Sequence, residues 1–99
     1  MSNIKTREVT TKSKGIKAVI KEAITYGENQ EIMDVYRDDK LSRSEAARKA
    51  NKLGVEKIII SIDGVTENIY EVFKELELPD ALELTDEVKK ILDPKGVGK

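Results

Sequence analysis

The chain has 99 residues, contains no cysteine and no histidine, and carries 18 basic and 19 acidic side chains. The lack of cysteine excludes disulfides, thiolate metal sites and a cysteine nucleophile, and it is typical of a reducing compartment. Neither an apolar signal segment nor an apolar run that could span a bilayer is present, so we expect a cytoplasmic protein without membrane contact. This length predicts one globular domain, residues 13–92, followed by a flexible tail, residues 93–99.

Charge is unevenly distributed along the chain. Residues 1–21 hold six basic side chains against Glu8 alone (net +5), whereas residues 58–99 hold five against ten acidic ones (net −5). Either the basic front binds a polyanion, or the acidic back binds a basic partner, or the two ends attract each other within a monomer or across a homodimer.

The first twelve residues are mostly polar and predict either a flexible basic arm or an edge strand. If they form a flexible arm, replacing its basic residues by alanine should leave the stability nearly unchanged. From Ser13 to Tyr26 the apolar residues recur at helical spacing and Gly27 follows, which predicts a helix.

Two further helices are expected in the middle of the chain. Residues 28–39 predict one, with Asn29 as its N-cap. Ser42 and Glu45 have the S-x-x-E spacing of a capping box, which predicts the start of the next. Gly54 is expected to end that helix after Leu53, because a glycine in the left-handed conformation commonly follows the last helical residue.

Residues 57–62, KIIISI, predict a buried strand because isoleucine is stiff at χ1 and packs well on a pleated surface. A charge at Ile60 is therefore expected to unfold the protein. A lone strand needs a partner, which would be the N-terminal segment or the same strand of a second copy in a homodimer. Asp63 and Gly64 predict the turn that ends the strand.

The last third of the chain predicts two helices. Thr66 is expected to cap one whose apolar face holds Ile69 and Phe73. Because proline disfavours a helical conformation in the preceding residue, Leu78-Pro79 is expected to end that helix, and Thr85 would cap a final one through Leu92. The predicted fold is thus α+β and mostly α, with about five helices and one short buried strand.

Without histidine and cysteine, catalysis would depend on carboxylates, lysine and hydroxyl groups. Asp63 follows a strand but has no second catalytic group near it in the pattern. Asp34 and Asp38 lie one helical turn apart, yet two carboxylates are too few for a dedicated cation site. We therefore expect no enzyme, no cofactor and no metal site.

The first functional hypothesis is a small non-enzymatic regulatory protein that binds a protein partner, as an inhibitor, an antitoxin-like protein or an adaptor. An acidic line and nearby exposed leucines would form the docking surface. The residues concerned are Glu67, Glu71, Glu75, Leu78 and Leu82.

The alternative is a DNA-binding transcriptional regulator. The segment SEAARKANKLGV resembles the first helix and turn of a helix-turn-helix, and residues 57–62 paired across a homodimer would resemble a ribbon-helix-helix. Isoleucines are poorly suited to reading bases, so most of the affinity would come from phosphate contacts of the basic N-terminal segment. These contacts would involve Lys5, Arg7, Lys12, Lys14, Lys17 and Lys21.

Overall fold

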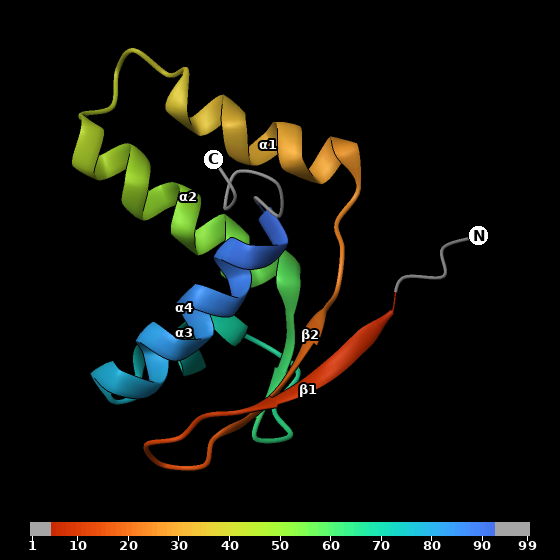
Figure 1. Cartoon of the computed structure of the whole chain (residues 1–99). Helices are drawn as coiled ribbons and strands as arrows, with labels where there is room; N and C mark the ends of the chain where they lie inside the picture. Colours follow the sequence, from red (N-terminus) through yellow and green to blue (C-terminus); the bar gives the residue numbers. More distant parts are fainter. Residues whose placement is uncertain (1–4, 93–99) are drawn as a thin grey trace.

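The computed structural model describes residues 5–92, which form a three-stranded antiparallel sheet and four helices (Figure 1). The α+β class is confirmed, with four helices rather than five in this part of the chain. The flexible tail predicted for residues 93–99 lies outside it. In chain order the elements are β1 (Thr6–Thr10), β2 (Lys17–Lys21), α1 (Tyr26–Tyr36), α2 (Arg43–Ile58), β3 (Ile59–Ile62), α3 (Ile69–Lys74) and α4 (Leu78–Leu92).

β1 and β2 form an antiparallel hairpin in which Val9 lies opposite Ala18. The strand order is β1-β2-β3, so the N-terminal segment is an edge strand. The sequence predicted that this strand pairs with residues 57–62, but its neighbour is β2. The alternative prediction of a flexible arm is therefore wrong for residues 5–12. Gly15, whose φ is 69°, lies in the loop between the strands, where its lack of a side chain permits the turn.

The helix predicted for Ser13–Tyr26 is wrong, because residues 17–21 form β2. Ala18 and Ile20 are buried while Lys17 is exposed, which is the alternation of a strand with one face on the core. The apolar residues of this segment fit a period of two as well as a helical period. Pairing with strands on both sides decides between them.

β3 is shorter than predicted, since residues 57 and 58 still belong to α2. It pairs with β2 of the same chain, so the strand finds its partner without a second copy. Ile20 lies opposite Ile59 and Val19 opposite Ser61, which leaves Ile60 as an extra residue in a bulge. Ile60 is consequently 37% exposed, and the expectation that it is buried is wrong.

α2 begins at the predicted capping box, where Ser42 accepts a hydrogen bond from the amide of Glu45 and the Glu45 carboxylate accepts one from the amide of Ser42. It does not end at Gly54 but continues to Ile58. Gly54 is buried, and a Cβ atom there would lie 3.2 Å from a methyl group of Val88 on α4. The glycine thus permits close packing of α2 against α4. Because the helix continues and a strand follows, the predicted helix-turn-helix is absent from this segment.

The C-terminal helices also differ from the prediction. α3 starts after Asn68, not at Thr66, although Ile69 and Phe73 are buried as expected. α4 is a single helix that contains Pro79 in its first turn, where the missing amide costs no hydrogen bond. Thr85 lies inside this helix and donates a hydrogen bond to the carbonyl oxygen of Ala81.

The core lies between one face of the sheet and the helices. Side chains from all of β2, α2, β3, α3 and α4 contribute to it, and their largest fully buried apolar members are Ile20, Val55, Ile58, Ile62, Leu84 and Val88. α1 packs mainly on α2, and the two form an antiparallel helical pair beyond the end of the sheet (Figure 1). This arrangement leaves one side of the α1–α2 pair facing α4.

Candidate functional site

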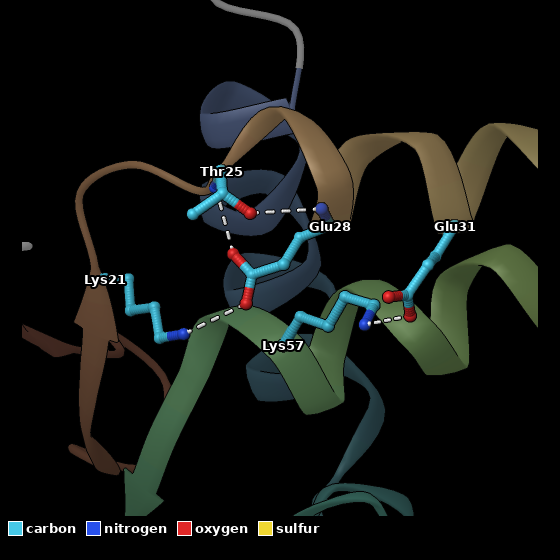
Figure 2. Close-up of polar contacts among 5 residues, drawn as sticks. All are labelled: Lys21, Thr25, Glu28, Glu31 and Lys57. Atoms are coloured by element: carbon cyan, nitrogen blue, oxygen red, sulfur yellow. Dashed lines mark hydrogen bonds and ion pairs between the residues drawn. The ribbon is translucent and has the colours of Figure 1, made fainter. Parts of the chain in front are cut away.

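The start of α1 is fixed by a group of polar side chains that join β2, α1 and α2 (Figure 2). Thr25 and Glu28 form a capping box, so the N-cap is Thr25 and not the predicted Asn29. The other carboxylate oxygen of Glu28 forms an ion pair with the Nζ atom of Lys21 at 3.4 Å. The hydrogen bond from the Thr25 amide and the nearby Lys21 charge hold the pKa of Glu28 below its ordinary value, although partial burial opposes them.

A second ion pair joins α1 to α2. The Lys57 ammonium group lies 2.6 Å from a carboxylate oxygen of Glu31, and the Lys57 side chain is mostly covered (Figure 2). Together with the capping box, this pair fixes the angle of α1 against α2. Figure 2 shows two separate sets of contacts, one among Lys21, Glu28 and Thr25 and the other between Lys57 and Glu31, and we assign both to architecture and not to chemistry.

The largest hollow in this region is an apolar groove of about 810 Å³ between α1, α2 and α4. α1 contributes Met33 and Tyr36, α2 contributes Ala47 and Ala50, and α4 contributes Leu82. The two alanines leave the space, since longer side chains on that face of α2 would fill it. We refer to this hollow as the helical groove.

The apolar walls of the helical groove are open to solvent. Tyr36 is 54% and Leu82 53% exposed, and Met33 is also exposed. Tyrosine and methionine are enriched at protein interfaces, where an aromatic ring supplies area and a thioether adapts its shape. Polar groups at the margin come from Asn51 and Lys89. The arrangement fits binding of an apolar surface.

The predicted protein-docking residues are not brought together. Leu82 lines the helical groove, whereas Leu78 is exposed one turn earlier on α4 and is not part of the lining. The acidic line does not exist as one helical stripe, because Glu67 precedes α3 and Glu75 follows its last residue. Glu71 lies within α3 and forms an ion pair with Lys74.

Three of the six predicted anion-binding residues form ion pairs within the chain. Arg7 forms an ion pair with Glu87 at 2.5 Å, and Lys14 forms one with Glu77 at 3.3 Å. Lys21 is held by Glu28, as described above. The remaining three form no ion pair with the described residues: Lys5, Lys12 and Lys17. Two of the six basic side chains, Arg7 and Lys14, therefore pair with acidic residues from the C-terminal part of the chain.

The acidic residues considered for chemistry have structural roles. Asp34 forms an ion pair with Arg37, and Asp38 accepts a hydrogen bond from the amide of Lys40. Asp63, in the left-handed conformation, accepts one from the amide of Lys17. Residues 5–92 contain no group of three or more carboxylates that could hold a metal ion.

Sequence reasoning missed the α1 wall of the helical groove. The exposure of Tyr36 depends on how far α4 lies from α1, which no local pattern encodes. Within residues 5–92, none of the helices is both long and apolar enough to cross a bilayer. The chain matches no family model, no curated protein and no solved structure.

Proposed function

We propose that this protein is a small regulatory protein that acts by binding a protein partner, and that the partner inserts an amphipathic helix into the helical groove. The observation that supports this most strongly is the gathering of exposed apolar side chains. Of the seven large apolar side chains exposed in residues 5–92, three line this groove: Met33, Tyr36 and Leu82.

The shape of the groove favours a helix as its occupant. Three helices line the groove, with two small alanine side chains on α2, and an amphipathic helix presents apolar residues at i, i+3, i+4 and i+7 to such a groove. The Lys57–Glu31 ion pair joins α1 to α2 and helps to hold the groove in shape before binding. A preformed site lowers the entropic cost of association.

The charge at the margin favours an acidic residue on that helix. Lys89 is the charged residue in the groove lining, and it forms no ion pair with the other described residues. An acidic side chain beside the apolar stripe of the partner would meet this ammonium group. Such a contact contributes more to orientation and specificity than to affinity.

The test is a selection from a displayed library of helical peptides of about 15 residues, a length that allows a marginally stable helix in water. The wild-type protein should select peptides with an apolar stripe flanked by Asp or Glu. Amide chemical shifts should then move on α1, α2 and α4 when a selected peptide is added. Leu82→Asp should weaken binding at least tenfold.

Val65→Asp is the matched control, since Val65 is also exposed and apolar but lies outside the groove. It should bind the selected peptides like the wild type. Peptides that bind Leu82→Asp as tightly as the wild type, or that shift residues elsewhere, would reject the helical groove as the docking site.

A further inference from the structure

A second surface, on the exposed side of α2, combines basic side chains with an aromatic ring. Here α2 and α3 enclose a shallow pocket of about 470 Å³. We call it the Tyr70 pocket, and its lining includes four basic residues, one carboxylate and one aromatic ring: Arg48, Lys49, Lys52, Lys74, Glu45 and Tyr70.

The Tyr70 ring brings two ammonium groups from different helices together. The Nζ atom of Lys52 on α2 lies 5.6 Å from the ring centroid, and that of Lys74 on α3 lies 5.4 Å from it. Both distances lie within the range of a cation–π attraction. Basic groups from two helices therefore lie beside one aromatic ring, and an anion bound in the pocket would be attracted by both.

Most of the charge in this pocket lacks an internal partner. Arg48, Lys49 and Lys52 form no ion pair among the described residues, and the pair of Lys74 with Glu71 is exposed to solvent. The carboxylate of Glu45 is committed to the capping box, where it accepts the amide of Ser42. Three cations of this pocket thus have no ion-pair partner among the described residues, and the fourth, Lys74, has only an exposed one.

We infer that the Tyr70 pocket binds the phosphate backbone of a nucleic acid. Arg48 and Lys52 are one helical turn apart, about 6 Å along the axis, so both can contact phosphates of the same strand. Because basic side chains surround the Tyr70 ring, the pocket contacts phosphates and does not stack on bases. This inference does not depend on the helical groove, which lies between α1, α2 and α4.

The experiment is fluorescence anisotropy of a labelled 20-nucleotide single strand and a labelled 20-base-pair duplex of mixed sequence, titrated with the full chain. With four phosphate contacts, the affinity for the duplex should fall about 100-fold between 50 and 200 mM salt. The triple variant Lys49→Gln, Lys52→Gln and Lys74→Gln should lose at least tenfold in affinity at 50 mM salt and show a shallower salt dependence.

A variant with the same loss of charge elsewhere is the matched control: Lys5→Gln, Lys12→Gln and Lys17→Gln. These lysines are exposed, lie on the β1–β2 hairpin and form no ion pair with the described residues. The control should keep most of the wild-type affinity. Thermal melts of both triple variants verify that they fold.

Three results would overturn the inference. They are an absence of binding at 50 mM salt, an equal loss of affinity in both triple variants, and displacement of the nucleic acid by polyglutamate of equal charge at the same concentration. The last result would assign the pocket to acidic polypeptides. Preference for the single strand or the duplex identifies which form of nucleic acid it binds.

Discussion

The Thr11 hydroxyl donates a 2.5 Å hydrogen bond to the carboxylate of Asp80, 69 residues later in the chain. Both residues are at most 2% exposed. The same hydroxyl accepts the amide of Ile16, and the same carboxylate oxygen accepts the amide of Lys14. The hairpin loop is thereby bound to the first turn of α4, beside the ion pairs that join the two elements.

Replacing Thr11 by valine, which has nearly the same shape but no hydroxyl, should reduce the free energy of unfolding by about 2 kcal/mol. The buried carboxylate of Asp80 would then lose a hydrogen-bond donor. Urea unfolding followed by circular dichroism measures the loss. Thr11→Ser, which keeps the hydroxyl, should retain most of the stability.

Thr10→Val is the control for β propensity, since Thr10 is the exposed neighbour in β1. It should change the stability by less than about 0.5 kcal/mol. If Thr11→Val is as stable as Thr10→Val, the bond to Asp80 does not hold the hairpin on α4.

The ion pair between Arg7 and Glu87 should make the stability depend on pH. The hydrogen bond from Arg7 and its charge hold the pKa of Glu87 below its ordinary value of 4.5, against a smaller opposing effect of burial. The folded state therefore favours the ionised form. The stabilisation of the fold by this ion pair is present above about pH 4.5. It is lost as the pH falls through the lowered pKa of Glu87 in the folded protein.

Arg7→Gln should accordingly cost about 0.5–1 kcal/mol at pH 7, because both side chains are partly exposed and solvent screens the pair. At pH 3 or below the difference from the wild type should shrink. Unfolding in urea at both pH values measures this. A difference that is equal at the two pH values would mean that Arg7 stabilises the fold by packing and not through the Glu87 charge.

Local signals in the sequence predicted part of the fold correctly. The capping box at Ser42 and the buried pair Ile69 and Phe73 depend on contacts within one or two turns, which a sequence pattern specifies. The strand β2 could not be identified in this way, because the spacing of Ile16, Val19 and Ile20 fits a helix until pairing with β1 and β3 is known. The packing role of Gly54 is likewise hidden in the sequence, because it depends on contact with Val88 on α4.

The candidate surfaces were harder to predict than the fold. Arg48, Lys49 and Lys52 were visible as the polar side of a helix, but Tyr70 joins them only because α3 packs beside α2. The basic N-terminal residues are a clearer cluster in the sequence, but ion pairs engage half of the six. Arg7 pairs with Glu87 on α4, Lys14 with Glu77 just before α4, and Lys21 with Glu28 on α1. Long-range pairing decides which charges remain available.

Gly54 provides a test of the packing between α2 and α4. Leucine at this position gains about 1 kcal/mol of helix propensity, but its Cβ would lie 3.2 Å from Val88 and 3.3 Å from Leu92. Overpacking of this kind costs more, so Gly54→Leu should lose about 2 kcal/mol. Glu56→Leu, an exposed change on the same helix, should stay within about 0.5 kcal/mol of the wild type. Thermal unfolding of both variants measures the difference, and equal stability would show that α4 can move away from α2.

The bulge in β3 makes two neighbouring isoleucines respond differently to a charge. Ile62 is 1% exposed, and an aspartate there would be buried without a partner, so Ile62→Asp should lose more than about 3 kcal/mol and unfold the protein. Ile60 lies in the bulge and is 37% exposed, so Ile60→Asp should remain folded and lose about 1 kcal/mol or less. Circular dichroism and size-exclusion chromatography of the two variants distinguish these outcomes. Unfolding of Ile60→Asp would place that side chain in the core and reject the register in which Ile20 lies opposite Ile59.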